Sequence, residues 1–466
     1  MSAVSAGRQP DVIVCGAGVA GMACAVRLAQ AGVRVLVLET RKKLGGRASS
    51  FIDPRTGEEL DNCQHVALSC CTSYLDLLTR LGRGDAMTWH PQLHWAERGG
   101  RVSTITPTRW LPAPAHMTLS LLGAHFLNAE ELTLLGIGSA RVLTASRERW
   151  RGKSFAQLLT WADQPETLIA KFWEPVVVSA CNLSCARTCA ATALKVFQEG
   201  LLAGPQAGQM GVPRVPLGAL YDEFAPLVQR AGGQVELGES VLRVRHEPGG
   251  ACVELEGGRV LRAGRVVCAL PFERAATVLD EPEWTGRGAQ LAGLAALGHS
   301  PILGVHIEMD RPVLALPHAV LVGAGTQWVF RKDLAGQRVH AVISGADAWM
   351  GLSQEQIVAR VVDDLRAYFP SRAADAQVVS ARAVKERRAT FVAAPGFERL
   401  RPSVIDAARP GACVLLAGDY CDVGWPATME GATRAGYAAA SAVLGADVRV
   451  PDLRPPALLR ALSALW

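Results

Sequence analysis

The chain contains 466 residues, of which 49% are hydrophobic and 20% charged, so it has enough apolar residues for two hydrophobic cores. Its net charge of +5 is small for this length, and its longest basic run is the Arg-Lys-Lys of residues 41–43, so composition argues against nucleic-acid binding. The first ten residues lack the apolar stretch of a signal peptide, and no segment has the roughly 18 apolar residues of a spanning helix. We therefore expect a cytoplasmic protein.

A strand, a glycine-rich turn, a helix and a second strand are predicted over residues 12–39. An apolar run leads into Gly16, Gly18 and Gly21, and a second apolar run after the helical pattern finishes at Glu39. In such a unit the first glycine permits the turn, the second lets a pyrophosphate approach the backbone, and the third lets the helix pack against the strand. Glu39 is placed to accept hydrogen bonds from ribose hydroxyl groups. The pattern predicts a dinucleotide-binding unit, which would suit either NAD or FAD.

Gly45, Gly46 and Arg47 follow the second strand by a few residues. The two glycines would permit a close approach between the backbone and a ligand, and an arginine beside a diphosphate would balance its charge. An ordinary basic turn is the alternative interpretation of the same residues. We predict that all three residues lie at the dinucleotide.

Twelve cysteines are scattered along the chain, and in a reducing compartment most of them are expected to be small buried residues. Cys181, Cys185 and Cys189 are spaced four residues apart, so a single helix would carry them along one face. Their spacing matches none of the usual zinc or iron–sulfur patterns, and no fourth ligand is evident. We predict no metal site.

From about residue 208 the sequence predicts a turn, a helix over 217–231, and strands that lead through a hairpin to 265–271. Residues 323–328 (GAGTQW) are similar to a second nucleotide loop, but a third glycine and a following helix are missing. A hairpin turn is therefore predicted at that point.

The C-terminal part of the chain has a pattern like that of its beginning, with a strand, a glycine-containing loop and a helix. A strand of the buried type ends at Gly418 and Asp419, and a proline-containing loop leads to a helix that starts at about Thr428 and Met429. Asp419 could bind a hydroxyl group of a ribityl chain, and the N–H groups of the helix start could point at a flavin ring. A nucleotide fold closed by the last strand and helix suits a cofactor that stays bound, so these features favour FAD over NAD.

Together these motifs resemble the flavin amine oxidase and phytoene desaturase superfamily. Within it, residues 46–68 (GRASSFIDPRTGEELDNCQHVAL), 172–182 (FWEPVVVSACN) and 424–432 (GWPATMEGA) are most similar to the hydroxysqualene dehydroxylases of hopanoid biosynthesis. The resemblance extends over essentially the whole chain. One departure is Cys63, which stands where this family is expected to have glycine, so that a side chain would occupy space near the flavin.

The resemblance implies an α/β fold in which a Rossmann-type FAD-binding domain is assembled from discontinuous segments and interleaved with an α+β substrate domain. It also implies that the backbone near Val241 lies beside the adenine of FAD. The predicted FAD-binding segments are 1–90, 206–285 and 405–466, and the predicted substrate-binding segments are 91–205 and 286–404.

If the resemblance extends to activity, the reaction is the reductive dehydroxylation of hydroxysqualene to squalene, with hydride from reduced flavin. Loss of the hydroxyl group from an allylic alcohol needs a proton donor and a pocket that keeps water from the allylic cation. His65 is the first candidate for the donor, because imidazole titrates near neutral pH and this stretch is expected to pass near the flavin. A structural histidine hydrogen-bonded to Asp61 is the alternative, and Asp422 is the second candidate for the donor.

Two other functions are consistent with the same motifs. A desaturase of the carotenoid or phytoene type would oxidise its polyisoprenoid, and the sequence does not decide the direction of electron flow. A lipid-binding protein of the GDP-dissociation-inhibitor type would use the fold without flavin chemistry, although the complete set of motif residues argues against it.

The electron donor and the membrane contact are left open by the sequence. No second dinucleotide motif is present, so NAD(P)H would have to dock transiently, or a carrier protein would supply the electrons. The segments 109–127 and 453–466 are apolar with basic flanks, a pattern that suits either peripheral contact with the inner face of the membrane or ordinary core helices.

Overall fold

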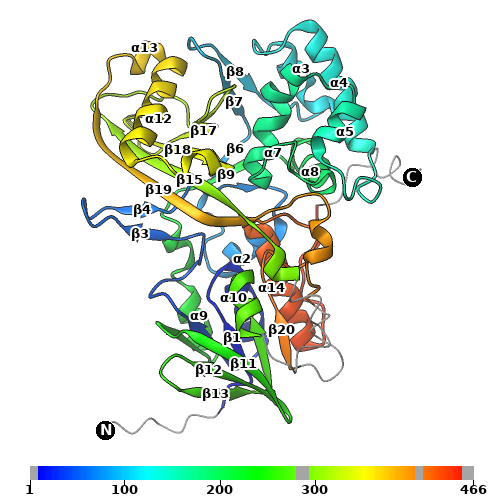
Figure 1. Ribbon diagram of the computed structural model, residues 1–466, viewed down its shortest axis with the longest axis vertical. Coiled ribbons are helices and arrows are strands. Elements are labelled where there is room, and N and C mark those ends of the chain that lie inside the picture. The colour runs from blue at the N-terminus through cyan, green and yellow to red at the C-terminus, as the bar shows by residue number, and fades with distance from the viewer. Residues whose placement is uncertain (1–8, 280–292, 405–412, 454–466) are drawn as a thin grey trace.

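The computed structural model describes residues 9–279, 293–404 and 413–453. Figure 1 shows a parallel sheet with its helices at the lower end of the molecule, and a mixed sheet beside a group of helices at the upper end. The chain passes between the two ends several times, so each end is built from segments that lie far apart in the sequence.

Five parallel strands form the sheet at the lower end, in the order β10-β2-β1-β14-β20. All but β10 are apolar runs with mostly buried residues, as expected of a parallel sheet that is covered on both faces. The strands are β1 (Val12–Cys15), β2 (Val35–Glu39), β10 (Gln234–Leu237), β14 (Arg265–Cys268) and β20 (Val414–Leu416).

The first and last described helices of this end, α1 (Val19–Gln30) and α14 (Met429–Leu444), pack against each other. Their contact is close because Gly436 has no side chain: a Cβ atom there would overlap the carbonyl oxygen of Ala20. The two ends of the sequence therefore meet in one hydrophobic core. The other helices of this core are α2 (Thr72–Arg80), α9 (Phe224–Arg230) and α10 (Phe272–Val278).

The helix predicted over 217–231 is wrong in its extent. A 3-10 turn, η4 (Gly218–Tyr221), is followed by a separate helix, α9. The backbone N–H of Leu217 donates to Asp61 at 2.9 Å, and that of Gly218 donates to Ser50 at 2.9 Å, so contacts with a distant hairpin fix the start of this segment. Helical periodicity does not report such contacts.

Smaller sheets complete the lower end and the middle of the molecule. An antiparallel sheet, inserted in the sequence between β10 and β14, consists of β11 (Val241–Glu247), β12 (Gly250–Leu255) and β13 (Val260–Ala263). The hairpin of β3 (Ser50–Ile52) and β4 (Glu59–Asp61) precedes a three-stranded sheet of β5 (Ala67–Leu68), β9 (Met210–Pro213) and β6 (Met87–His90).

A seven-stranded sheet forms the upper end, in the order β19-β15-β18-β17-β16-β7-β8. One face carries Leu303, Val305 and Ile307, which pack in a hydrophobic core with α12 (Gln354–Tyr368). The strands are β7 (Leu93–Ala96), β8 (Val102–Ile105), β15 (His299–Met309), β16 (His318–Leu321), β17 (Trp328–Arg331), β18 (Arg338–Ser344) and β19 (Val378–Phe391). The same part of the chain contains the helix α13 (Pro370–Ala373) and the 3-10 turns η6 (Ala346–Trp349) and η7 (Phe397–Leu400).

The hairpin turn predicted within residues 323–328 is confirmed, because β16 and β17, which this segment connects, pair antiparallel. The helix group beside the sheet has its own hydrophobic core. Its elements are η1 (Ala115–Met117), α3 (Thr118–Leu122), α4 (Ala129–Thr144), α5 (Phe155–Trp161), α6 (Glu166–Leu168), η2 (Ile169–Trp173), α7 (Glu174–Cys181), α8 (Ala190–Lys195) and η3 (Val196–Leu201).

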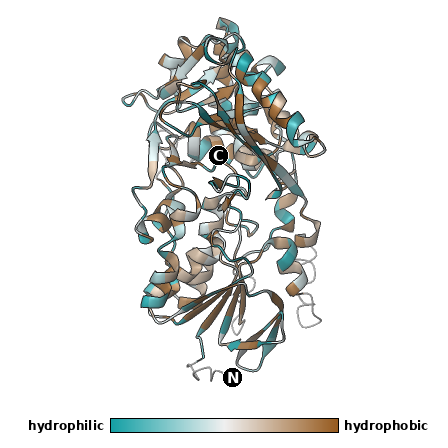
Figure 2. Cartoon of the chain, turned by 90° about the vertical axis from the view of Figure 1, so that its left-hand side faces the viewer, coloured by the Kyte–Doolittle hydropathy of each residue, from teal (hydrophilic) through white to brown (hydrophobic). Residues whose placement is uncertain are grey.

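Figure 2 shows that the strands at the lower end are largely brown, the colour of hydrophobic residues. This agrees with the buried apolar residues of the parallel sheet. The five strands of that sheet all come from the segments predicted to bind FAD, and the seven strands of the mixed sheet all come from the other segments. The predicted α/β fold class is confirmed, whereas the exact domain boundaries stay a prediction.

Candidate functional site

The first glycine loop joins β1 to α1 and is shaped by close backbone contacts. Gly16 has a φ of +105°, and a Cβ atom on it would lie 2.7 Å from the carbonyl oxygen of Ala269. A Cβ atom on Gly21 would overlap the carbonyl oxygen of Gly16. These two glycines are therefore required by the fold itself, whether or not a ligand is bound.

Gly18 differs from its neighbours, because a Cβ atom on it would meet no protein atom within 4 Å. It is the N-cap residue of α1, a helix of 12 residues with neither a side-chain cap nor an acidic residue in its first turn. The start of α1 thus offers backbone N–H groups and the positive end of the helix dipole to an anion. Binding of a diphosphate on the open side of this glycine stays a prediction.

The second glycine loop lies directly against the first. Gly45 donates its N–H to the carbonyl oxygen of Ala17 at 3.0 Å and forms a parallel bridge with Gly18. Gly45 and Gly46 have φ values of +91° and +61°, and a Cβ atom on Gly46 would lie 3.1 Å from the Cα of Gly18. The predicted proximity of the two loops is therefore seen in the backbone.

Glu39 stands at the end of β2, the strand next to the first loop. Its carboxylate accepts hydrogen bonds from the N–H of Ala17 and from that of Arg41, both at 2.8 Å. The carboxylate is partly exposed at this edge of the sheet, where ribose hydroxyl groups would meet it.

Val241 is the first residue of β11, just beyond β10, and it is buried. Its carbonyl oxygen accepts a hydrogen bond from Arg274 at 3.2 Å. Its contact with adenine stays a prediction.

Arg47 and Asp419 connect the second loop to the C-terminal strand. The guanidinium Nη2 of Arg47 lies 2.6 Å from Oδ1 of Asp419, and Nη1 donates to the carbonyl oxygen of Ala389 at 2.9 Å. Asp419 is buried, whereas 36% of the Arg47 side chain is exposed. Gly418, just before it, lies against the ring of Tyr420, which a Cβ atom would overlap. The pair brings together two residues that were predicted separately as cofactor-binding.

The predicted start of the last helix agrees with the structure. Thr428 is the N-cap of α14, its hydroxyl accepts from the N–H of Gly431 at 3.1 Å, and Met429 is the first helical residue. Contact of Thr428 and Met429 with a flavin ring stays a prediction.

The loop after β4 carries His65, whose Nδ1 lies 3.0 Å from the carbonyl oxygen of Cys63. A carbonyl oxygen only accepts, so Nδ1 must carry the proton, and Nε2 is left to exchange a proton with another group. Burial lowers the pKa of His65 from its ordinary value of 6.5, although the Cys63 carbonyl raises it. The alternative in which His65 bonds to Asp61 is not what the structure shows: the Asp61 carboxylate accepts from Ser50 and Leu217.

Three residues that the sequence analysis does not single out hold this loop against the mixed sheet. His306 donates through Nε2 to the carbonyl oxygen of Asp61 at 2.9 Å, and Lys332 donates to the side chain of Gln64 at 2.9 Å. The ring of His340 stacks on that of His306 with 3.9 Å between centroids. The sequence signal for His306 and His340 was a histidine within each of two apolar strands, β15 and β18. Only the pairing of these strands, which places the two histidines opposite each other, shows that they are in contact.

Asp422 lies in the loop before α14, and half of its side chain is exposed. Its carboxylate is 4.0 Å from the guanidinium of the buried Arg401. Cys63 is buried in a small apolar cluster with Met210, Phe330 and Val342, so its side chain packs between the loop and the sheet. The positions of His65 and Asp422 do not test a catalytic role for either residue, so both roles stay predictions.

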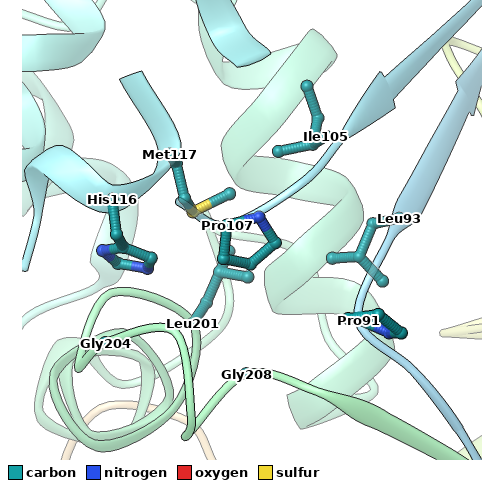
Figure 3. A pocket seen from close by; sticks show the side chains of 9 residues that line it. All are labelled: Pro91, Leu93, Ile105, Pro107, His116, Met117, Leu201, Gly204 and Gly208. Carbon is teal, nitrogen blue, oxygen red and sulfur yellow. The ribbon is translucent and has the colours of Figure 1, made fainter. Parts of the chain in front are cut away.

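A pocket lies between the helix group, the ends of β7 and β8 and the loop before β9 (Figure 3). Its volume is small, about 10 Å³, which is room for roughly one water molecule, and none of its lining side chains is charged. Figure 3 shows Met117, Pro107 and Leu201 close together in its middle and His116 at one side. Its lining residues are Pro91, Leu93, Ile105, Pro107, His116, Met117, Leu201, Gly204 and Gly208.

The cysteines of residues 181–189 do not share a helix, because α7 ends at Cys181 and α8 begins at Ala190. Burial raises the pKa of Cys181 to about 12 and, together with Glu398, raises that of Cys189 to about 11. Cys189 donates to Glu398 at 2.8 Å. Within the ranges that the structure describes, no group of histidine, cysteine or acidic side chains is arranged to hold a metal ion.

Comparison with known proteins decides which of the nucleotide-binding families this geometry represents. The sequence profile described as flavin containing amine oxidoreductase matches residues 19–444. The chain belongs to this family. The family match covers α1 with Gly21, the second glycine loop, Glu39, the Arg47–Asp419 pair and α14, and it makes the chain an FAD-dependent oxidoreductase. The alternative of a lipid-binding protein without flavin chemistry is therefore not retained.

Relatives within this flavin-dependent family confirm the resemblance stated above. Hydroxysqualene dehydroxylase from Sinorhizobium fredii is 28% identical over 450 residues, covering 93% of this chain and 98% of that protein. A 15-cis-phytoene desaturase from Synechococcus elongatus is 25% identical over 476 residues, covering 93% and 95%. The solved structure of cyclohexylamine oxidase from Brevibacterium oxydans shares the fold, with a TM-score of 0.67 at 19% identity over 94% of this chain and 99% of that one.

Proposed function

We propose that this flavoenzyme reduces hydroxysqualene to squalene. The observation that carries the proposal is the similarity to hydroxysqualene dehydroxylase over almost the full length of both chains, together with an imidazole, His65, on a loop between the FAD-binding end and the mixed sheet. The similarity to phytoene desaturase supports the broader class of polyisoprenoid substrates.

In this reaction the carbon–oxygen bond of the allylic alcohol breaks, and the oxygen leaves as water after it has taken up a proton. Reduced FAD, when bound, supplies the hydride that forms the new carbon–hydrogen bond and is oxidised by two electrons. The proposal assigns the FAD-binding role to Gly16, Gly18, Gly21, Glu39, Gly45, Gly46, Arg47, Val241, Gly418, Asp419, Thr428 and Met429.

The chain's own residues would then supply the proton and keep water out. His65 holds one proton on Nδ1 through the Cys63 carbonyl, so a second proton on Nε2 makes it an acid that can protonate the leaving hydroxyl group. The apolar cluster of Cys63, Phe330 and Val342 lies on the mixed-sheet side of the same loop and would exclude water from the allylic cation. Asp422 is the second candidate for the acid.

The proposal includes a cytoplasmic location, peripheral contact with the inner face of a membrane, and electrons from NAD(P)H or a carrier protein. A substrate that dissolves in lipid supports the contact. None of the helices in residues 9–279, 293–404 and 413–453 is long and apolar enough to cross a membrane. The predicted contact through residues 453–466 falls almost entirely outside the described residues.

Product analysis tests the proposal and its nearest alternative. The FAD-loaded enzyme is reduced without oxygen and given hydroxysqualene, while the oxidised enzyme is given phytoene with a quinone as acceptor. The proposal expects squalene from the first reaction and no dehydrogenated product from the second. Formation of a desaturated polyene with no squalene would instead favour a phytoene-type desaturase, whose similarity to this chain is only slightly lower.

A further inference from the structure

Arg401 lies just after η7, and only 3% of its side chain is exposed. Its guanidinium donates to three consecutive backbone carbonyl groups of the loop after β20. Nη2 lies 3.0 Å from the carbonyl oxygen of Asp419 and also donates to that of Cys421, and Nε lies 3.1 Å from that of Tyr420. One buried side chain therefore provides the hydrogen bonds for three buried carbonyl groups of this loop.

The direction of these carbonyl groups fixes the direction of the N–H groups between them. In a trans peptide the N–H of one residue points away from the C=O of the residue before it. Because the Asp419 carbonyl points at Arg401, the N–H of Tyr420 points to the opposite side. This N–H has no hydrogen-bond acceptor among the residues that the structure describes, whereas the N–H of Cys421 donates to Gly418 at 3.0 Å. The loop therefore offers the Tyr420 N–H to a ligand on the side away from Arg401.

Asp419 is held both by its backbone and by its side chain. Its carbonyl oxygen accepts from Arg401, and its carboxylate lies 2.6 Å from the guanidinium of Arg47. The two arginines come from distant parts of the sequence, since Arg401 follows β19 and Arg47 follows β2. Neither the peptide group nor the carboxylate of Asp419 can turn without the loss of a hydrogen bond to an arginine.

The surroundings of Arg401 suit a guanidinium group rather than an ammonium group. The central carbon of the guanidinium lies over the rings of Phe391 and Phe397, at 5.2 and 5.5 Å from their centroids. A flat guanidinium can stack on aromatic rings while its N–H groups spread over several acceptors, whereas the ammonium group of lysine is a compact point charge. Lysine at position 401 would keep the charge but would lose the fork that reaches three carbonyl groups.

We infer that Arg401 is a positioning residue for FAD. It holds the loop of residues 418–422 in the conformation in which the Asp419 carboxylate and the Tyr420 N–H face the cofactor. Arg401 acts through this loop, because its own N–H groups are used by the loop carbonyl groups. The inference rests on the assignment of Gly418 and Asp419 to FAD within the proposed function, but not on the identity of the substrate.

The test measures the dissociation constant of FAD by titration of the apoprotein, with flavin fluorescence as the signal. Arg401→Lys is expected to raise this constant about tenfold or more, because it keeps the charge and loses the fork. Leu365→Ala is the matched control: Leu365 is buried in the core between α12 and the mixed sheet, so its loss lowers the melting temperature and leaves the dissociation constant unchanged. An Arg401→Lys protein that binds FAD as tightly as the control would overturn the inference.

Chemical rescue separates positioning of the loop from a general loss of stability. Arg401→Ala removes the guanidinium, and added ethylguanidinium ion is expected to bring the dissociation constant of FAD back to within roughly threefold of the wild-type value. Ethylammonium ion at the same concentration is expected to leave it raised. Equal effects of the two ions, or no effect of either, would contradict the role of the guanidinium fork. Failure of both Arg401 variants to fold as apoproteins would show a general structural role and would also overturn the inference.

Asp419→Asn distinguishes failure of this inference from failure of the proposed function. If Asp419→Asn weakens FAD binding and Arg401→Lys does not, the inference fails and the assignment of Asp419 to FAD stands. If neither variant weakens FAD binding, the assignment of this loop to FAD fails, and the inference fails with it. Weaker FAD binding in both variants, with no turnover of hydroxysqualene by the wild type, would support the inference and remove the proposed substrate.

Discussion

At the scale of single residues, the glycines of the first loop serve two different purposes. Gly16 and Gly21 lack side chains because backbone atoms fill the space, whereas the space beside Gly18 is open. These contacts agree with the different roles that the motif predicts for the three glycines. The fold requires glycine at positions 16 and 21. At position 18 only a bound ligand would require it.

Substitutions at these glycines should therefore have different effects. Gly18→Val is expected to keep the melting temperature of the apoprotein within a few degrees and to lower FAD content about tenfold or more, because the new side chain enters the anion site. Gly21→Val is expected to destabilise the apoprotein by about 1–3 kcal/mol or more, because it overlaps the carbonyl oxygen of Gly16. Thermal unfolding and flavin absorbance measure both, and equal destabilisation by the two variants would contradict the distinction.

His65 carries a prediction on pH. If its imidazolium is the acid, turnover must fall as pH rises through the pKa of His65, which burial holds below 6.5. His65→Gln is expected to keep FAD and to lose about a hundredfold or more in kcat, together with this pH dependence. The pH profile of single-turnover rates is the measurement. If the variant keeps the wild-type pH profile, His65 is not the acid, and Asp422 or another group must be. Asp422→Asn is the parallel variant that tests the second candidate.

At the scale of elements, the site is made where segments from the two ends of the sequence meet. Sequence periodicity predicts β1, α1, β2, β20 and α14, because short apolar runs and glycine turns are local signals. It does not predict that Arg47 pairs with Asp419, although it selects both residues, because 372 positions separate them. It also misses His306, Lys332 and His340, which reach the His65 loop only through strand pairing.

The Arg47–Asp419 ion pair should contribute more to the free energy of unfolding than a surface ion pair with the same distance between its atoms. Arg47→Met leaves the buried Asp419 carboxylate without its partner and is expected to cost on the order of 1–2 kcal/mol of unfolding free energy, a figure kept low because the guanidinium is over a third exposed. Arg34→Met is the control, since Arg34 and Asp11 are also 2.6 Å apart but Asp11 is exposed. Denaturant unfolding and FAD content report the difference, and similar losses in both variants would refute it.

The support of the His65 loop can be tested through His306. His306→Phe retains a ring to stack on His340 and removes the hydrogen bond to the Asp61 carbonyl. It is expected to lower kcat by roughly three- to tenfold, about the loss of one hydrogen bond, with FAD content unchanged. His125→Phe, at an exposed histidine, is the control. If kcat and its pH profile match the wild type, the hydrogen bond does not position His65.

At the scale of the whole molecule, the two ends have separate tasks. We assign FAD binding to the parallel sheet and its glycine loops, and the mixed sheet with its helices supplies the apolar surfaces and the pocket. The His65 loop lies between them, with hydrogen bonds from the mixed sheet to its backbone and side chains. Composition predicted two cores of this kind, but only the fold shows that the candidate acid stands where they meet.

The central claim is that reduced flavin in this protein is oxidised by an allylic alcohol. The most direct test mixes the reduced FAD-loaded enzyme with hydroxysqualene in the absence of oxygen and follows flavin absorbance, with squalene measured in the same samples. The account predicts that the absorbance of oxidised flavin returns with one squalene formed for each flavin, and that squalene added in place of hydroxysqualene has no effect. Flavin that stays reduced in the presence of hydroxysqualene would contradict it.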